Sequence, residues 1–290
     1  MAEGFDATAA ERPGDQKNGR IAVILALACV AVVLIHIFSP DERFKTWSVQ
    51  TTHLRLDSLN QIVLLKDSLV APIVYSNVSG LEQLHVPYAK EMFVSVLLPS
   101  ILVAKHSLSQ DRLRMEYLQK KKKNWDTYDS IFYLERKVRY RASGPDNLLA
   151  RMGALPNSIV LAQAAVESGW GRSRFFLEGN NVFGIWSYNP GEPRIMAGQT
   201  RDSTAIYVRA YENIAQSIED YFETLGSARA YHHLRKARLE TNDPFILLPH
   251  LKYYSERRTH YTNQLKTIIM QNDFTRYDNF RIDPRYLVAE

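Results

Sequence analysis

The sequence predicts an α+β fold that is mainly helical, and two patterns indicate this. Apolar residues recur every three to four positions in several stretches, most regularly between Ser158 and Val166. Only 204–211 alternates apolar and polar residues as a half-buried strand does, and it follows a segment, 187–202, that an Asn-Pro-Gly turn marks as a hairpin. The next helix, from about Ala215 to Leu225, is expected to bury Ile218, Phe222 and Leu225. With 290 residues and 46% hydrophobic content, the chain has enough apolar material for a large core in one or two domains.

The N-terminal part is expected to anchor the protein in a membrane. Residues 1–20 are polar and are predicted to form a cytoplasmic tail. Ile21–Phe38 is an uninterrupted apolar run without Asp, Glu, Lys or Arg, long enough for a transmembrane helix. Lys17 and Arg20 precede it, so the positive-inside rule places everything after Phe38 outside the cytoplasm. The residues after the run form a poor signal-peptidase site, which favours an uncleaved anchor.

Cys29, the only cysteine, lies inside this apolar run. A single cysteine excludes an intramolecular disulfide. A lipoprotein site at Cys29 is the alternative to an anchor, but the apolar sequence continues well past it. We therefore expect Cys29 to be a small apolar residue of the membrane segment.

The region between the anchor and Glu167 is expected to be mostly helical. Residues 39–79 mix short apolar runs with polar residues and are interpreted as a stalk or packing segment, and 80–145 as a helical N-terminal part. Pro87 suits a first helical turn, Pro99 is expected to kink or end the helix, and Ser109 to cap the next one. The expected elements here are helices at 86–104 and 110–123, and one more amphipathic segment at 125–138.

Residues 146–290 are predicted to form the catalytic domain, with Glu167 at its centre. A helix through Ser158–Val166 has Pro156 in its first turn and Gly169 just past its last. Glu167 then lies at the negative end of the helix dipole, next to apolar residues such as Trp170, and both features disfavour the ionised carboxylate. A carboxyl group that keeps its proton near neutral pH is suited to protonate the leaving oxygen of a glycosidic bond.

The segments around Glu167 carry a family resemblance. AQAAVESGWG, then SRF, then GNNVFGIW, resembles the catalytic signature of the bacterial glucosaminidase family of peptidoglycan hydrolases, most closely its Bax-like branch. The similarity extends upstream through VPYAKEMFVSVLLPSIL and DRL, and downstream through VRAYENIAQSIEDYFETL to YSERRTHY. It covers roughly residues 70 to 280, and it is specific because several motifs agree in order.

The resemblance implies a lysozyme-like catalytic domain with a small β-hairpin lobe, which acts on peptidoglycan glycan strands. The Glu of ESGWG is the catalytic acid of the family, so this role is assigned to Glu167. The late tyrosines, Tyr254 and Tyr261, are candidates for the tyrosine that family members place near the scissile bond. The predicted substrate-binding residues are Asn181, Phe183 and Trp186 along the groove, together with Tyr207 and Tyr211 on the polar face of the strand at 204–211.

The identity of a second catalytic acid is open. Many glucosaminidases carry a second Glu about ten residues before the strand that ends in Arg-x-Tyr, and here no Glu has that spacing. Asp202 or Glu192 is the candidate to activate water. Alternatively, the acetamido oxygen of the substrate attacks the sugar carbon while Glu167 protonates the leaving group, and Tyr254 or Tyr261 lies near the developing charge.

Other chemistries are not indicated. The eight histidines show no H-E-x-x-H spacing and no cysteine pair exists, so neither a metal site nor a cofactor is expected. The basic run at 120–123 is interpreted as a solvated helix end, and no nucleic-acid partner is predicted. A net charge of +5 is compatible with an acidic polymer partner, but solubility explains it equally well.

The sequence thus predicts a single-pass inner-membrane protein whose catalytic domain faces the periplasm. The expected activity is that of an endo-β-N-acetylglucosaminidase, which cuts the β-1,4 bond after N-acetylglucosamine in peptidoglycan. Two alternatives remain: a lytic transglycosylase or muramidase on the same fold, and a catalytically inactive glycan-binding scaffold.

Overall fold

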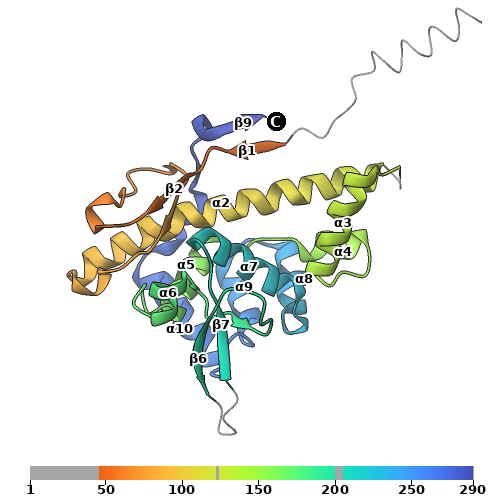
Figure 1. Ribbon diagram of the computed structural model, residues 1–290. Coiled ribbons are helices and arrows are strands. Elements are labelled where there is room, and N and C mark those ends of the chain that lie inside the picture. Colours follow the sequence, from red (N-terminus) through yellow and green to blue (C-terminus); the bar gives the residue numbers. More distant parts are fainter. Residues whose placement is uncertain (1–45, 122–123, 200–204, 290) are drawn as a thin grey trace, which may run out of the picture. The chain divides into compact units, whose positions relative to one another are not determined.

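The computed structural model describes residues 46–121, 124–199 and 205–289. Its helices form one body from which a small sheet projects (Figure 1). The helices are α2 (Val86–Lys120), α3 (Thr127–Arg139), α4 (Pro145–Arg151), α5 (Asn157–Glu167), α6 (Arg174–Gly179), α7 (Ile214–Ser227), α8 (His232–Glu240), α9 (Pro244–Leu247) and α10 (Thr259–Gln271). The strands are β1 (Trp47–Val49), β2 (Thr52–Arg55), β3 (Leu69–Val70), β4 (Ile73–Ser76), β5 (Trp186–Ser187), β6 (Arg194–Gln199), β7 (Ala205–Arg209), β8 (Arg281–Ile282) and β9 (Leu287–Ala289). The predicted α+β, mainly α, class is confirmed.

The centre of the helical body is α5, which is buried from Asn157 to Ala165. Its apolar residues from Ile159 to Ala165 have at most 1% exposure, and the polar Asn157, Ser158 and Gln163 are buried as well. Helices α2, α10 and the turn at Phe274–Asn279 pack around it. A helix that is surrounded on all sides is held rigidly, so the residue at its end has a fixed position.

Helix α2 is a correction to the sequence prediction. Two helices, 86–104 and 110–123, were expected, with Pro99 kinking or ending the first and Ser109 capping the second, but one continuous helix runs from Val86 to Lys120. Proline inside a helix costs about 3 kcal/mol because it lacks an N–H group. Burial of its neighbours offsets this cost. Leu97, Leu98 and Ile101 are completely buried, and burying each side chain stabilises the fold by about 1.5–3 kcal/mol.

The apolar face of α3 also differs from expectation. The helix forms at Thr127–Arg139 with Asp126 as its N-cap, inside the amphipathic segment that was predicted. Yet Tyr128 and Val138, two of the apolar residues of that amphipathic pattern, are 79% and 77% exposed. The buried aromatic residue is Phe132, whose ring lies between the guanidinium groups of Arg114 and Arg136. The helix is therefore attached through Phe132 and its charged neighbours.

The described residues before α2 pack against the helical body. Strand β2 pairs with β4, while β3 and β1 pair with the C-terminal strands β8 and β9. Leu56, Val70 and Tyr75 of this region lie in the same hydrophobic core as α5. Thr46–Glu290 consequently forms one compact unit. The predicted tail at 1–20 and the predicted span at 21–38 lie outside the described residues.

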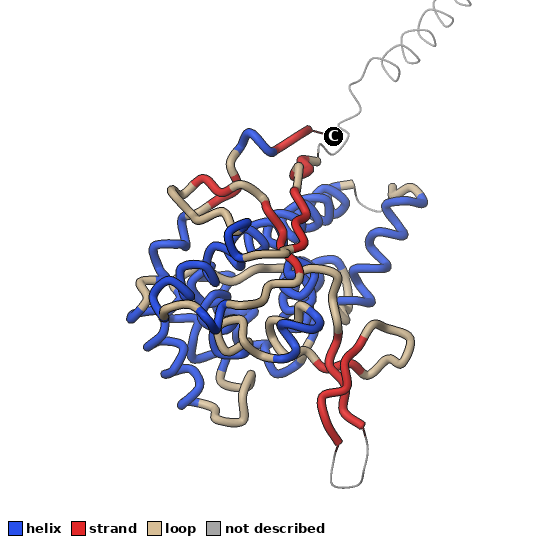
Figure 2. The backbone as a smooth tube through the Cα atoms, turned by 60° about the vertical axis from the view of Figure 1, so that its left-hand side comes forward, coloured by secondary structure: helices blue, strands red, loops and turns tan. Residues whose placement is uncertain are grey.

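The projecting sheet is the predicted β lobe. Strands β5 and β6 flank β7 in the order β5-β7-β6, all antiparallel, with a bulge between Met196 and Gly198. Figure 2 shows these strands leaving the helices as a separate element. Val208 points into the body and is 2% exposed. Helix α7 follows directly, and its predicted inward residues Ile218, Phe222 and Leu225 are buried.

Among the described residues, α2 is the one helix that has the length and apolarity of a membrane span. However, 67% of its most apolar window is buried inside the protein. Its apolar character is explained by its place in the core, because core helices pass the same test of length and composition.

Candidate active site

Glu167 is the last residue of α5, and the turn after it is well defined. The Gly169 N–H donates to the Val166 carbonyl and the Trp170 N–H donates to the Ala165 carbonyl, which is the pattern of a Schellman cap. Gly169, Trp170 and Gly171 all have positive φ. Such a conformation suits glycine, and the Trp170 ring is held in place by Phe93 at 5.4 Å and Phe274 at 6.0 Å. The cap ends the helix sharply and leaves the Glu167 side chain directed toward α10.

The Glu167 carboxyl lies among tyrosines. The Tyr261 hydroxyl donates to its Oε1 atom at 2.7 Å, and in the described part of the chain this is its one hydrogen-bond partner. Burial raises the pKa of Glu167, while the Tyr261 hydrogen bond and the charge of Arg257 act in the opposite direction. Desolvation is the largest effect. The predicted environment, which makes negative charge unfavourable at position 167, is therefore present.

Tyr254 lies beside Tyr261. The two rings are stacked with centroids 5.9 Å apart and an angle of 8° between them. The Tyr254 hydroxyl donates to the Phe183 carbonyl at 3.2 Å. Burial raises the pKa of Tyr254 well above its ordinary value, and Tyr261 and Glu167 add to this effect. Both predicted tyrosines thus lie close to Glu167, and both remain protonated at neutral pH.

Asn181 and Phe183 are buried. The Asn181 amide donates to the carbonyls of Ile185 and Arg209 and accepts from the Ile185 N–H. These hydrogen bonds hold the segment that leads into the β lobe. The Phe183 ring stacks on Tyr221 at 4.1 Å and is 3% exposed. Neither side chain presents a free face, and their predicted contact with sugar stays a prediction.

Trp186 and Tyr207 lie on the β lobe. Trp186 is 52% exposed, and the 81% exposed Tyr188 lies beside it with ring centroids 6.2 Å apart. The Tyr207 ring is covered by the Arg194 guanidinium at 3.9 Å. Of the predicted aromatic residues, Trp186 is the one that offers an open surface to a flat sugar ring.

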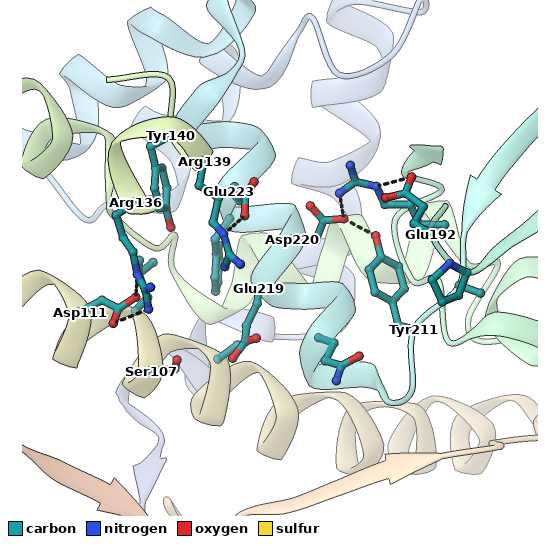
Figure 3. A pocket seen from close by; sticks show the side chains of 17 residues that line it. Ser107, Asp111, Arg136, Arg139, Tyr140, Glu192, Tyr211, Glu219, Asp220 and Glu223 are labelled. Atoms are coloured by element: carbon teal, nitrogen blue, oxygen red, sulfur yellow. Dashed lines mark hydrogen bonds and ion pairs between the residues drawn. The ribbon is translucent and has the colours of Figure 1, made fainter. Parts of the chain in front are cut away.

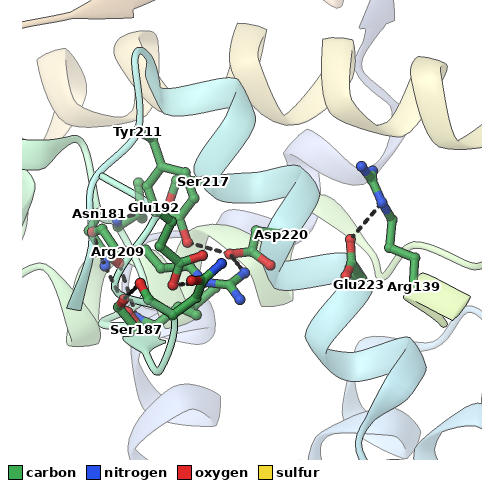
Figure 4. A network of polar contacts seen from close by, with 12 residues as sticks. Arg139, Asn181, Ser187, Glu192, Arg209, Tyr211, Ser217, Asp220 and Glu223 are labelled. Atoms are coloured by element: carbon green, nitrogen blue, oxygen red, sulfur yellow. Dashed lines mark hydrogen bonds and ion pairs between the residues drawn. The ribbon is translucent and has the colours of Figure 1, made fainter. Parts of the chain in front are cut away.

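Glu192 and Tyr211 belong to a separate polar network, drawn in Figure 4. Glu192 pairs with Arg209 at 3.3 Å, and Arg209 in turn pairs with Asp220 at 2.7 Å. The Tyr211 hydroxyl also donates to Asp220. Glu192 is therefore engaged by Arg209 rather than by the tyrosines around Glu167. Asp202, the other candidate for a second acid, lies outside the described residues.

This network borders a charged cavity of about 460 Å³ between α2, α3 and α7, shown in Figure 3. Asp111 pairs with Arg136 and Glu223 pairs with Arg139. Burial raises the pKa of Glu223 to about 7 and also raises the pKa of Glu219. Tyr221, which lies between these two glutamates in α7, is buried on the other face and belongs to the Glu167 site.

Sequence reasoning missed two residues of the Glu167 site, Gln163 and Tyr221. Gln163 lies one helical turn before Glu167, and its amide donates to the Tyr261 hydroxyl at 2.9 Å. Tyr221 donates to the other side of the same amide. A glutamine within an otherwise apolar stretch, at i, i+4 spacing from a glutamate, was the available signal.

The chain matches known proteins in this region. Residues 146–274 match the model of a family described as glucosaminidase, mannosyl-glycoprotein endo-beta-N-acetylglucosaminidase. The chain is also 29% identical over 136 residues to the Bax protein of Escherichia coli. That match covers 44% of this chain and 46% of the relative, so it spans less than half the length of either protein. The residues matched by the family model include Glu167, Tyr254 and Tyr261.

Two solved structures are similar to part of the chain. The catalytic domain of the autolysin Auto from Listeria monocytogenes has 23% sequence identity and a TM-score of 0.37, with 53% of this chain and 90% of that chain covered. The glycoside hydrolase domain of FlgJ from Salmonella typhimurium has 23% identity and a TM-score of 0.34, with 48% and 88% covered.

Proposed function

Because residues 146–274 form a domain of the glucosaminidase family, we propose that this protein is a peptidoglycan hydrolase that cuts the β-1,4 bond after N-acetylglucosamine. The observation that carries the proposal is the Glu167 carboxyl, buried at a rigid helix end with Tyr261 as its hydrogen-bond donor. The relatives are consistent with this activity, since FlgJ carries a glycoside hydrolase domain and Auto is an autolysin.

Glu167 acts as the general acid. Burial favours its protonated form, so the group holds a proton at a pH where an exposed glutamate has lost it. As the glycosidic bond breaks, this proton passes to the leaving oxygen and Glu167 becomes a carboxylate. The Tyr261 hydroxyl already points at Oε1 and stabilises that charge without reorganisation.

The group that attacks the sugar carbon is either water or the acetamido oxygen of the substrate. Glu192 is ion-paired with Arg209, which reduces its availability as a base. The acetamido route is favoured because it needs no second carboxylate, and the described hydrogen-bond partner of Glu167 is the Tyr261 hydroxyl. This route retains the anomeric configuration, whereas water activated by Asp202 or Glu192 in one step inverts it. NMR of the first product anomer therefore separates the two.

A lytic transglycosylase is the second candidate, and one observation favours it. Among the described residues, no second carboxylate is hydrogen-bonded to the tyrosines around Glu167. A single acid is sufficient when a hydroxyl of the sugar itself attacks. Mass spectrometry of digested glycan strands distinguishes the products. A glucosaminidase leaves a reducing N-acetylglucosamine end, and a transglycosylase leaves an anhydro-muramoyl end.

The decisive test compares the wild type with Glu167→Gln on purified peptidoglycan. We expect fragment release to fall by about 10²–10⁴-fold, the usual contribution of a general acid. Glu178→Gln, at an exposed glutamate of α6 that pairs with Arg174, is the matched control and should retain activity. If the wild type binds glycan and releases no fragments, the protein is a binding scaffold and the proposed activity is wrong.

We also propose that Ile21–Phe38 anchors the protein in the inner membrane with the catalytic unit in the periplasm. The proposal rests on the apolar run and on Lys17 and Arg20 before it. Protease added to intact spheroplasts should digest residues 46–290 and spare a cytoplasmic tag placed before residue 1. Protection of the catalytic unit would reverse the orientation.

A further inference from the structure

A chain of hydrogen bonds, in which every donor points toward Glu167, runs from Tyr221 through Gln163 and Tyr261. Tyr221 donates to Gln163 Oε1, Gln163 Nε2 donates to the Tyr261 oxygen at 2.9 Å, and Tyr261 donates to Glu167 Oε1 at 2.7 Å. Gln163, Tyr221 and Tyr261 are fully buried. Water therefore does not compete for these groups, and each donor requires its partner in the chain.

The direction of the chain follows from the Gln163 amide. Its oxygen can only accept and its nitrogen can only donate. Because the Tyr221 hydroxyl takes the oxygen side, the NH₂ group faces Tyr261 and occupies a lone pair of its hydroxyl oxygen. The Tyr261 hydrogen cannot then point back to Gln163, and it is directed to Glu167.

Helix geometry makes this arrangement possible. Gln163 and Glu167 are separated by one turn of α5, so their side chains emerge on the same face. Tyr261 from α10 reaches both of them, and Tyr221 from α7 reaches Gln163 from the other side. The Phe183 ring, stacked on Tyr221 at 4.1 Å, restricts the tyrosine that begins the chain.

We infer that Gln163 and Tyr221 are positioning residues, which hold the Tyr261 hydroxyl as a donor to Glu167 and thereby set the proton affinity of the acid. The catalytic meaning of this role rests on the proposed function, while the positioning itself does not. Burial raises the pKa of Glu167, and the hydrogen bond from Tyr261 acts in the opposite direction. A donor that is oriented in advance stabilises the carboxylate that forms when the proton leaves.

Other charged and titratable groups also face Glu167. Arg257, which precedes α10, lowers its pKa through its charge, although less than burial raises it. The hydroxyls of Tyr231 and Tyr254 lie near enough for Glu167 to raise their own pKa values. None of these is a link in the Gln163 chain. Tyr231→Phe is accordingly a matched control, since it removes a buried hydroxyl near Glu167 and leaves the chain intact.

The test measures the pKa of Glu167 directly, by ¹³C NMR of the glutamate carboxyl carbons in the detergent-solubilised full chain, with the signal assigned from its loss in Glu167→Gln. Tyr221→Phe frees the amide to rotate and accept from Tyr261, and Gln163→Met removes the amide. Each should raise the pKa of Glu167 by about one unit, the value of one hydrogen bond to a charged group. Tyr231→Phe should not raise it.

A double variant separates positioning from a merely structural role. Tyr261→Phe should raise the pKa as much as Tyr221→Phe does, and the combination of both should raise it no further, because they interrupt one chain. Tyr221→Phe should also lower kcat several-fold and leave KM unchanged. An unchanged Glu167 pKa in folded Tyr221→Phe, or additive shifts in the double variant, would overturn the inference.

The NMR titration needs no turnover. If Glu167→Gln keeps full hydrolytic activity while the titration behaves as expected, the proposed role of Glu167 as general acid fails and the positioning chain stands. If activity depends on Glu167 and the titration shows no shift, the chain fails and the function stands. Should Gln163→Met not fold, Tyr221→Phe alone decides the question, because it deletes one oxygen and keeps the ring that packs on Phe183.

Discussion

The two faces of α7 show two ways to bury a carboxyl group. On one face, Tyr221 leads through Gln163 and Tyr261 to Glu167, whose hydrogen-bond partner is a neutral hydroxyl. On the other face, Asp220 is held by the guanidinium of Arg209. Burial raises the pKa of Glu167, whereas Asp220 has a cation to pair with its charge. The carboxyl group whose described partner is a neutral hydroxyl is thus the one whose pKa is raised by burial.

The largest expected effect is a loss of stability when the ion pair between Asp220 and Arg209 is removed. Asp220→Asn removes the charge that Arg209 and Tyr211 share, at a carboxyl that is 12% exposed. We expect a loss of roughly 2–3 kcal/mol in the free energy of unfolding, since hydrogen bonds to charged groups are the strong ones. Urea unfolding of residues 46–290 measures it. Glu192→Gln removes the longer ion pair of Arg209, at 3.3 Å, and should lower the free energy of unfolding by less than about 1 kcal/mol. Equal losses in the two variants would contradict the prediction that the Asp220 pair is the stronger one.

An intermediate effect, on activity and on its pH dependence, is expected from Tyr261→Phe. Tyr261→Phe removes the one hydroxyl that stabilises ionised Glu167, so the pKa of Glu167 should rise further. A general acid loses its activity as the pH rises through its pKa, so the alkaline limb of the pH–rate profile should move to higher pH. The maximal rate should fall about tenfold, because the carboxylate loses its donor. A move of the alkaline limb to lower pH would show that Tyr261 raises the pKa of Glu167 and does not lower it.

The smallest effect concerns Glu223, whose ion pair with Arg139 is partly exposed. Burial raises its pKa to about 7, so between its ordinary value and about 7 the folded state binds more protons than the unfolded state. Stability should then fall as pH rises through this window. Glu223→Gln should flatten that part of the stability profile, measured as Tm against pH. Glu212→Gln, at an exposed glutamate that accepts a hydrogen bond from Gln216, is the control and should leave the slope intact.

The local sequence determined α5, its end and the identity of Glu167. Apolar spacing, Pro156 before the helix and Gly169 after it are all local signals, and the observed cap uses the same residues. The family resemblance read from AQAAVESGWG is confirmed by the match at 146–274. The strand at 204–211 and helix α7 were predicted in the same way, because alternation and helical spacing are properties of neighbouring residues.

Tertiary structure decided what no local pattern contains. Pro99 was expected to interrupt a helix, and the core on all sides keeps α2 continuous. Tyr128 and Val138 belong to the apolar pattern at 125–138, yet they are exposed, and Phe132 with its two arginines attaches α3. In each case the free energy of packing against distant residues outweighs the local preference.

The same division applies to the site. The sequence by itself identified Glu167 as the candidate acid, because a glutamate at a helix end can be read from its neighbours. Only the fold decided its donor, since Tyr261 is 94 residues from Glu167, and Gln163 is 98 residues from Tyr261 and 58 from Tyr221. Hydrogen bonds over such separations depend on how helices pack, and the spacing of residues within one helix does not encode that packing.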